Sequence, residues 1–484
     1  MNDHPTETGL DPQDWEAFRA RAHEMLDRAM DHMMGAGEGP VWRAPTEDLA
    51  SRFSRPVPQD GQGGDAVMAD IAALMPFGVG NAHPRFLGWV HGAGTPSGVI
   101  PELAAVAMNA NLGGRHHGAA LVEKQVVNWC KSLFGFPEEA SGLIVTGTSM
   151  ATIIALKAAR DRVLGFVNRA EGNGGGGLVG YASAEAHACI ARAFDLLGLG
   201  SDALRKVPVT DAFEMDIDAL RQRIDWDRAR GLTPFVVIGT AGSVNTGAID
   251  DLDALADIAA EHGMWFHVDG AFGALGLLSP EIAPRLSGIG RAESLAFDFH
   301  KWMQVTYDAG CVLIRDEEAH RRAFSDRPDY LSPATRGLSA GNPWPVEYGP
   351  ELSRGFRALK VWAQIAEHGV AKLGQVVMQN CAQARYLANR IAQEPMLQPL
   401  APVSLNICCF RFVAQGLDGD ALDRLNDEIV IRLQESGIAA PSTTRLGGEL
   451  AIRVNITNHR TRLADMDILA DAVIKTGQAV VDEI

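Results

Sequence analysis

The residues of this sequence best suited to covalent chemistry lie at the end of a segment with the composition of a buried strand. In Glu293–Trp302, β-forming residues lead to Lys301, which is flanked by Phe299 and Trp302. Apolar neighbours disfavour the charged form of an amine, and a neutral amine is a nucleophile. The chemistry that uses such an amine is Schiff-base formation with a carbonyl compound. A solvated lysine at a strand end is the simpler alternative.

A second segment, Met264–Asp269, is an apolar run that ends in a carboxylate. His267 and Asp269 are two residues apart, so on a strand their side chains share a face. A carboxylate at the end of an apolar strand is costly to bury without a cationic partner. That partner could be an arginine or the protonated nitrogen of a pyridine ring.

A candidate phosphate site precedes the helix expected over residues 151–160. The backbone N–H groups and the dipole at a helix N-terminus attract anions, and Thr148 and Ser149 add hydroxyl donors. Simple capping of the helix by these hydroxyls is the alternative. The glycine run 174–177 has no strand before it, so we expect a flexible loop there rather than a phosphate site.

Alternating strands and helices must position these residues. Apolar strands that alternate with helices, one of which begins near His187, favour a mostly parallel sheet covered on both faces. Ligands of such sheets bind at the carboxyl ends of the strands, where Ser243, Asp269 and Lys301 fall. The expected strands are 179–183, 234–240, 264–269 and 307–314.

The chain is expected to divide into three parts. Residues 1–82 form an N-terminal arm whose helical periodicity over 10–35 lacks a local core, so we expect the arm to pack on a partner subunit. Residues 83–370 form a large domain, and residues 371–484 form a smaller α/β domain. Within the large domain, the Pro-, Gly- and Ser-rich segment from Phe324 to Tyr348 contains Tyr330 and has the length of a lid.

Composition narrows the class of protein. The 484 residues are 46% hydrophobic and 21% charged, as in ordinary globular proteins. The net charge of −17 argues against nucleic acid or an anionic membrane as partner. The cysteines lack CxxC spacing, the N-terminus is no signal peptide, and no long apolar run could span a membrane, so we expect a cytoplasmic protein. Adjacent His116 and His117 lack the spacing of helical metal ligands, and we expect no metal.

The phosphate site, the buried aspartate and the amine are together what a protein needs to hold pyridoxal phosphate. Tyr181–Ser183 with His187, His267–Phe272 and Asp298–Trp302 closely resemble the group II pyridoxal-phosphate-dependent decarboxylases. That family includes aromatic-amino-acid, glutamate, cysteine-sulfinate and diaminobutyrate decarboxylases. The resemblance extends from about His83 to the last helix. It implies the α/β type I fold of pyridoxal-phosphate enzymes and a homodimer with its active site at the subunit interface.

The resemblance also implies roles for the matching residues. Lys301 would bind the cofactor covalently, His187 would stack on its ring, Asp269 would pair with the ring nitrogen, and Tyr330 would return a proton after carbon dioxide leaves. Further cofactor contacts are expected from Thr148, Ser149, Ser243, Ala271 and His300, and substrate contacts from Arg453, His91 and Asn111.

The implied reaction converts an L-amino acid to its amine and carbon dioxide through Schiff-base and quinonoid intermediates. An aldehyde synthase or another type I pyridoxal-phosphate enzyme is the first alternative, and a catalytically inactive dimeric scaffold is a remote one. Relatives that became aldehyde synthases have replaced either the loop tyrosine or the stacking histidine. Tyr330 and His187 are both present, which favours simple decarboxylation.

Some positions depart from the family pattern. Asn109, Asn111 and Leu112 align with an aromatic wall of the aromatic-specific enzymes, so they favour a polar, even acidic, substrate side chain. Asp298 stands where other members have an asparagine beside the phosphate. These departures bear on the substrate rather than on the class of reaction.

Overall fold

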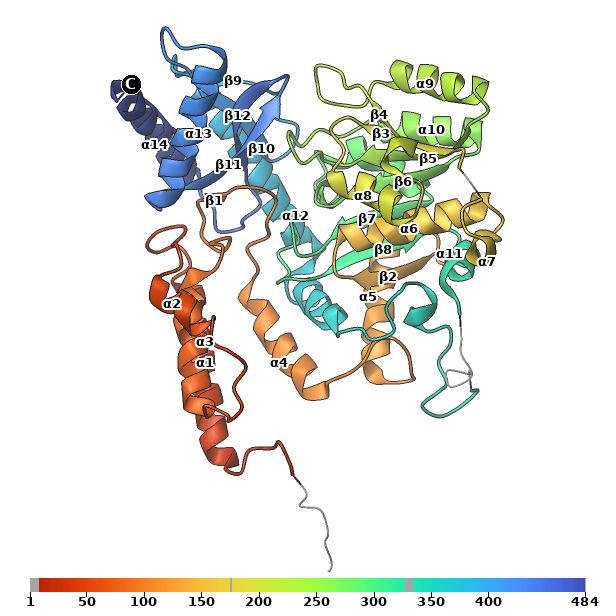
Figure 1. The fold of residues 1–484 in the computed structure, drawn as a ribbon, viewed down its shortest axis with the longest axis horizontal. Coiled ribbons are helices and arrows are strands. Elements are labelled where there is room, and N and C mark those ends of the chain that lie inside the picture. The colour runs from red at the N-terminus through yellow and green to blue at the C-terminus, as the bar shows by residue number, and fades with distance from the viewer. Residues whose placement is uncertain (1–7, 175, 327–333, 484) are drawn as a thin grey trace, which may run out of the picture.

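The computed structural model describes residues 8–174, 176–326 and 334–483, and its larger sheet has seven strands in the order β2-β8-β7-β6-β5-β3-β4 (Figure 1). Four of the six neighbouring pairs are parallel, and β8 runs antiparallel to both β2 and β7. The structure therefore confirms an α/β fold with a mostly parallel sheet. The strands are β2 Ser141–Val145, β3 Leu178–Ser183, β4 Leu204–Val207, β5 Thr233–Thr240, β6 Trp265–Asp269, β7 Ser294–Asp298 and β8 Gly310–Ile314.

Helices cover both faces of this sheet. On β6, Phe266 and Val268 pack into one hydrophobic cluster and Trp265 packs into the other, because successive side chains of a strand point to opposite faces. Burial on both sides explains why these strands are almost continuously apolar. One face is covered by α5 Gly118–Phe134, α10 Leu252–His262 and α12 Arg357–Ala392, and the other by α6 Thr148–Val163, α8 Ala188–Leu196 and α11 Glu317–Phe324.

A second, five-stranded sheet has the order β1-β11-β12-β10-β9. Its first strand, β1 Phe86–Leu87, pairs in parallel with the start of β11. Phe86 and Leu87, which fall in the expected large domain, therefore add a strand to the sheet formed by the C-terminal part of the chain. The other elements here are β9 Leu397–Pro399, β10 Ile407–Phe412, β11 Ala440–Leu446, β12 Glu449–Asn455, α13 Gly419–Glu435 and α14 Leu463–Asp482.

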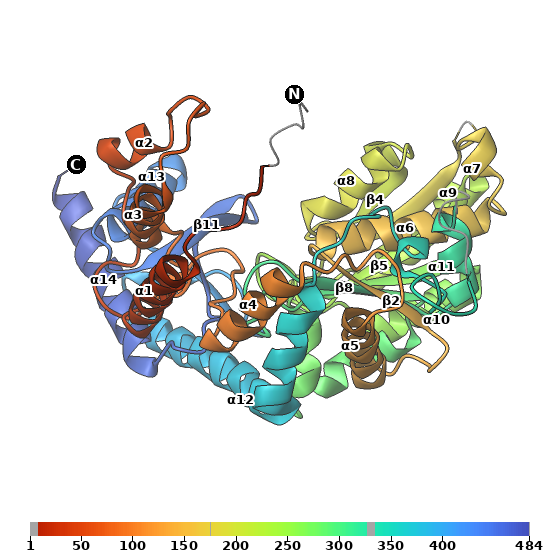
Figure 2. The ribbon, with the colours of Figure 1, turned by 90° about the horizontal axis from the view of Figure 1, so that it is seen from below.

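The long helix α12 joins the two sheets (Figure 2). The sequence predicts two consecutive helices here, one ending near His368 and the next near Ala392, and the structure agrees, because the 36-residue element is broken by a non-helical residue at Gly369 (φ 70°, ψ 153°). Glycine adopts this positive φ without a steric penalty, so the chain changes direction there. The remaining helices of the large part are α4 Val99–Met108, α7 Asn168–Glu171 and α9 Ile217–Ala229, with short 3₁₀ helices between several of the elements.

The N-terminal arm extends away from the rest of the molecule (Figure 1). The sequence predicts its first helix, α1 Trp15–Met34. Residues 36–65 are rich in Gly and Pro, so the sequence predicts a linker or an arm there without helices. Two more helices, α2 Glu47–Arg52 and α3 Gly64–Leu74, form in this part of the chain, and the hydroxyl of Thr46 caps α2 by accepting the N–H of Leu49 at 3.2 Å. Among the described helices, none is long and apolar enough to cross a membrane.

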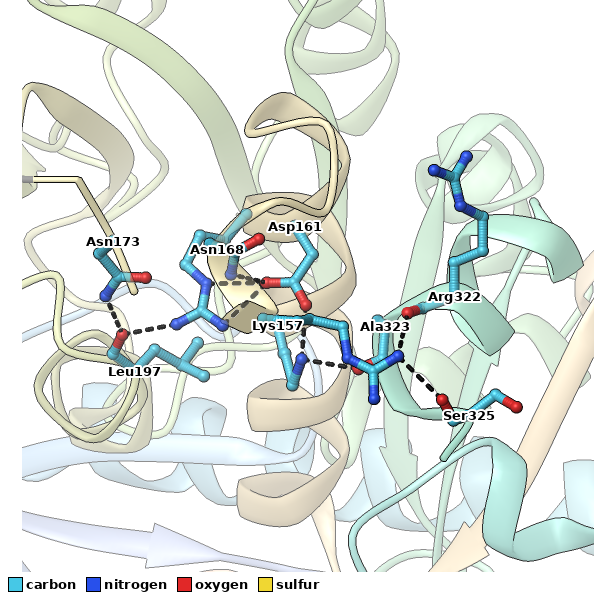
Figure 3. Close-up of polar contacts among 10 residues, drawn as sticks. Lys157, Asp161, Asn168, Asn173, Leu197, Arg322, Ala323 and Ser325 are labelled. Atoms are coloured by element: carbon cyan, nitrogen blue, oxygen red, sulfur yellow. Dashed lines mark hydrogen bonds and ion pairs between the residues drawn. The ribbon is translucent and has the colours of Figure 1, made fainter. Parts of the chain in front are cut away.

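The far end of α6 is fixed by Asp161, a fully buried carboxylate (Figure 3). Arg160 donates to it from Nε at 2.9 Å and from Nη2 at 2.8 Å, and the amide of Asn168 donates at 2.7 Å. Lys157 also pairs with Asp161 and donates to the carbonyl of Ala323 at 2.7 Å. The cluster thus ties α6 to α7 and to the end of α11.

Replacing Asp161 with alanine should destabilise the fold strongly. The substitution leaves the guanidinium of Arg160 buried without its counterion, a change that costs about 3–5 kcal/mol. Urea titrations should show this loss in the free energy of unfolding, whereas the control Asp225→Ala, at an exposed position of α9, should change it by less than about 0.5 kcal/mol. A loss below about 1 kcal/mol would contradict the role given to Asp161.

Candidate active site

The carboxyl ends of three parallel strands meet at one edge of the large sheet. Thr240 of β5 pairs with Asp269 of β6, and Asp269 pairs with Ala296 of β7. A cavity of about 240 Å³ opens beside this edge. It is lined by Trp89, Val90, His91, His187, Thr240, Gly242, Val244, Asp269, Ala271, Phe272 and Lys301. The structure therefore brings together Lys301, Asp269, His187, Ala271 and His91, which the sequence analysis selected from distant segments.

Asp269 is the buried anion of this cavity, with an exposed fraction of 3%. Its Oδ1 accepts the backbone N–H of Ala271 at 3.1 Å. Burial raises the pKa of Asp269, and Lys301 and the Ala271 N–H oppose the rise. Within the described residues, no arginine or lysine forms an ion pair with this carboxylate, so a cation that enters the cavity would supply the partner that the sequence analysis expects.

His187 lies immediately before α8 and its ring caps that helix. Nδ1 accepts the N–H of Cys189 at 3.2 Å, so a neutral ring carries its proton on Nε2. Burial lowers the pKa of His187, while the carboxylate of Asp269 opposes this effect. The cap therefore holds an uncharged imidazole in a fixed orientation at the wall of the cavity.

Lys301 reaches the cavity from the turn after β7, and its side chain is 22% exposed. Its ammonium lies 3.0 Å from Oδ2 of Asp298. The sequence predicts an apolar environment for this amine, and Trp302 and Phe299 are indeed buried next to it. The ion pair with Asp298 differs from that expectation, because it places a charged group beside the amine.

The expected phosphate site surrounds Asp298. Thr148 is the first residue of α6, and its N–H donates to Oδ1 of Asp298 at 2.7 Å. The hydroxyl of Thr148 is buried and has no hydrogen-bond partner among the residues that the structure describes. Nε2 of His300 lies 3.7 Å from Oδ2 of Asp298. Ser149, in contrast, is exposed on the first turn of α6.

These features fit pyridoxal phosphate. The cavity offers a lysine that can react with the aldehyde of the cofactor. It also offers a buried carboxylate, without an ion pair among the described residues, that can bind the protonated ring nitrogen. At its edge, a helix N-terminus and the unpaired hydroxyl of Thr148 offer donors for the phosphate. Lys301, Asp269, His187 and Thr148 are thus the residues that would hold the cofactor.

Ser243 does not line the cavity, although its neighbours Gly242 and Val244 do. Its hydroxyl lies 3.0 Å from that of Thr246 and accepts the N–H of Ala248 at 3.2 Å. The side chain therefore fastens the turn after β5, and direct contact between Ser243 and a cofactor stays a prediction.

Arg453 of β12 adjoins the cavity from the smaller sheet. Its Nε donates to the carbonyl of Val244 at 2.7 Å, and its Nη1 donates to that of Trp89 at 3.0 Å. Its Nη2 is buried and has no partner in the described part of the chain. Burial lowers the pKa of Arg453 to about 10. A buried cation with one free donor beside the cavity is suited to a carboxylate.

The other expected substrate residues differ in position. His91 lines the cavity, and burial, with Lys301 nearby, lowers its pKa. Asn111 is exposed and does not line this cavity; its Oδ1 accepts the N–H groups of Gly113 and Arg354, each at 2.9 Å. A substrate contact by Asn111 therefore stays a prediction, and Tyr330 lies outside the described residues.

Several lining residues were not selected from the sequence. Thr240 ends an expected strand, so its place at the edge of the sheet could have been inferred from the rule that selected Asp269. Phe272 ends the segment His267–Phe272 that resembles the family, but its residue type alone predicts no role. No local sequence pattern predicts that Trp89 and Val90 line the cavity. They follow β1, which is only two residues long and pairs with a strand more than 350 residues away.

Comparison with known proteins agrees with this geometry. The family model described as the pyridoxal-dependent decarboxylase conserved domain matches residues 46–413. The aromatic-L-amino-acid decarboxylase of Bacillus atrophaeus is 32% identical over 465 residues, which are 93% of each chain. The phenylacetaldehyde synthase of Petunia hybrida is 26% identical, over 96% of this chain and 94% of that protein.

Solved structures share the fold. The structure of Oryza sativa TDC with PLP and tryptamine superposes with a TM-score of 0.90, at 23% identity and over 98% of this chain and 100% of that one. Mouse CSAD gives a TM-score of 0.89 at 23% identity, over 96% of this chain and 99% of that one. At this level of identity, the two superpositions establish the type I fold that the sequence resemblance implies.

Proposed function

Because this chain belongs to the pyridoxal-dependent decarboxylase family and is therefore a carboxy-lyase that uses pyridoxal phosphate on an amino acid, we propose that Lys301, Asp269 and His187 carry out its chemistry. One observation carries the proposal. The amine of Lys301 and the buried carboxylate of Asp269 line the same cavity, and within the described residues no lysine or arginine forms an ion pair with that carboxylate.

When bound, pyridoxal phosphate supplies an electron sink for the electron pair that remains after carbon dioxide leaves. Lys301 would hold the cofactor covalently through its amine, at the position that the amino group of the substrate has to reach. Asp269 holds a proton on the ring nitrogen; a pair at about 4 Å with an effective dielectric near 20 contributes roughly 4 kcal/mol. The capped ring of His187 and the side chain of Ala271 would contact the ring of the cofactor. Thr148, Ser149 and His300 would hold its phosphate, and Arg453 would bind the substrate carboxylate.

We propose an aromatic side chain for the substrate. Trp89, Val90, Val244 and Phe272 give the cavity an apolar wall, and the relative from Bacillus atrophaeus is named for aromatic L-amino acids. The polar substrate favoured by the sequence analysis depends on Asn111 and its neighbours, and Asn111 does not line this cavity.

A panel of the twenty amino acids and common non-protein relatives, scored for released carbon dioxide, tests this assignment. We expect the highest kcat/KM for Phe, Tyr, Trp or a hydroxylated derivative. If glutamate, aspartate or cysteine sulfinate gave the highest value, the substrate assignment would be wrong, although the class of reaction would stand.

We propose simple decarboxylation rather than aldehyde formation, with Tyr330 as the residue that returns a proton to the substrate carbon. Replacing Tyr330 with phenylalanine removes that proton donor, so the product should shift from amine toward aldehyde, with uptake of oxygen. Chromatography of the products and an oxygen electrode measure both effects. An unchanged ratio of amine to aldehyde would remove Tyr330 from the mechanism.

We propose that the enzyme is a homodimer with its active site at the interface, and that the arm packs on the partner subunit. Helix α1 has twenty residues and none of them is buried within this chain. Helices in proteins gain most of their stability from packing, so α1 needs a further surface to pack on. The neighbouring helix α4 exposes Ile100, Leu103 and Val106. Light scattering after gel filtration should give twice the mass of the chain, and a monomer would contradict the proposal.

The six buried, free cysteines suit a reducing compartment, so we further propose a cytoplasmic location.

A further inference from the structure

The carboxylate of Asp298 occupies the centre of the proposed phosphate site. Its exposed fraction is 2%, and its two oxygens have separate partners. Oδ1 accepts the N–H of Thr148 at 2.7 Å, which is the first N–H of α6. Oδ2 lies 3.0 Å from the ammonium of Lys301 and 3.7 Å from Nε2 of His300.

The surrounding backbone is shaped to admit this carboxylate. A Cβ at Gly310 would lie 2.6 Å from Oδ1 of Asp298 and 2.6 Å from Cα of Gly147. A Cβ at Gly147 would lie 3.4 Å from the same oxygen and 3.3 Å from the ring of His300. Two glycines on different elements therefore leave room for the Asp298 side chain against the start of α6.

We propose that Asp298 is a placeholder anion, which satisfies Thr148 and Lys301 before the cofactor binds and thereby lowers the affinity of the site for the cofactor phosphate. This inference rests on the proposed function, in which the same helix N-terminus binds that phosphate. Among residues 8–174, 176–326 and 334–483, the buried hydroxyl of Thr148 has no partner, so a donor remains available while Asp298 holds the N–H.

The physical reason is competition and repulsion. A phosphate monoester carries a charge between about −1.5 and −2 near neutral pH, and a buried carboxylate at the same helix N-terminus opposes its entry. Asp298 also forms an ion pair with Lys301, which has to separate before the amine can reach an aldehyde. The first effect depends on the phosphate group, whereas the second acts on any aldehyde that reaches Lys301.

The test compares the cofactor-stripped wild-type protein with Asp298→Asn, which keeps an oxygen to accept the Thr148 N–H but has no charge. Dissociation constants for pyridoxal phosphate, for pyridoxal without phosphate and for inorganic phosphate are measured by visible absorbance and tryptophan fluorescence. We expect Asp298→Asn to bind pyridoxal phosphate and inorganic phosphate at least about tenfold more tightly, and to change pyridoxal much less. The control Asp225→Asn, on the exposed side of α9, should match wild type.

The remaining outcomes are informative. Unchanged or weaker binding of pyridoxal phosphate by Asp298→Asn, or equal tightening of pyridoxal and pyridoxal phosphate, would overturn the placeholder role. If the wild-type protein bound pyridoxal as tightly as pyridoxal phosphate, the phosphate site itself, and so the proposed function of α6, would be wrong. Should Asp298→Asn fail to fold in thermal unfolding, Asp298→Ser provides a smaller uncharged acceptor for the same comparison.

Discussion

Replacing Lys301 with alanine should yield a protein that lacks covalently bound cofactor and forms no amine. Lys301 is the lysine that lines the cavity, and its amine has to form the bond to the aldehyde carbon. We expect kcat to fall by roughly four orders of magnitude or more, the scale on which covalent catalytic residues act. Absorbance spectra of the purified protein and assays of released carbon dioxide measure the two effects.

The control for this substitution is Lys206→Ala, an exposed lysine on β4 of the same sheet. It should leave both the spectrum and kcat unchanged. A Lys301→Ala protein that keeps the visible band of the wild-type enzyme would show that another residue holds the cofactor.

Replacing Asp269 with asparagine should produce the second-largest loss. The substitution keeps the shape of the side chain and its hydrogen bond with Ala271 but removes the charge that stabilises a protonated ring nitrogen. A loss of roughly 4 kcal/mol corresponds to about three orders of magnitude in rate. The affinity for the cofactor should fall as well. The rate of carbon dioxide release and the dissociation constant of the cofactor can be measured on the same preparation.

Asp250 provides a matched control, because it is a buried carboxylate close to the same strand end. It accepts the N–H groups of Thr240 and Met215, and burial raises its pKa to about 6, but it does not line the cavity. Asp250→Asn should affect stability more than kcat. If Asp269→Asn kept kcat within about tenfold of wild type, the ring-nitrogen role of Asp269 would be refuted.

Much of the arrangement of the candidate site can be predicted from the sequence, because parallel strands place their carboxyl ends at one edge of a sheet. Asp269 and Lys301 are 32 positions apart, yet the ends of β6 and β7 are adjacent because the two strands are paired. The apolar composition of these strands follows from helices on both faces, and that composition predicts the mostly parallel sheet that is found. His187 could be located because it directly precedes a recognisable helix.

Other features depend on contacts that no local pattern records. Trp89 reaches the cavity only because β1 pairs with Ala440 and Pro441 across the length of the chain. Helices α2 and α3 are flanked by Gly and Pro residues, which obscured their periodicity. The placement of Asp298 against Thr148 requires the two strands β2 and β7 to flank β8, an order that alternating elements do not specify.

The substrate wall is hard to derive from one chain for a further physical reason. The polar loop with Asn111 uses its amide to bind the backbone of Gly113 and Arg354, so it is a structural part of its own subunit. The loop does not line the cavity of its own subunit, so it would contact a substrate only in the cavity of a partner subunit. The aromatic substrate is therefore proposed from the apolar residues that line the cavity.

The measurement that bears most directly on the central claim is reduction of the native enzyme with borohydride, followed by proteolysis and mass spectrometry. We expect one pyridoxyl-phosphate group per chain, on the peptide that contains Lys301, with loss of the visible band. Attachment at a different lysine, or no attachment in an enzyme that still releases carbon dioxide, would contradict the role of Lys301.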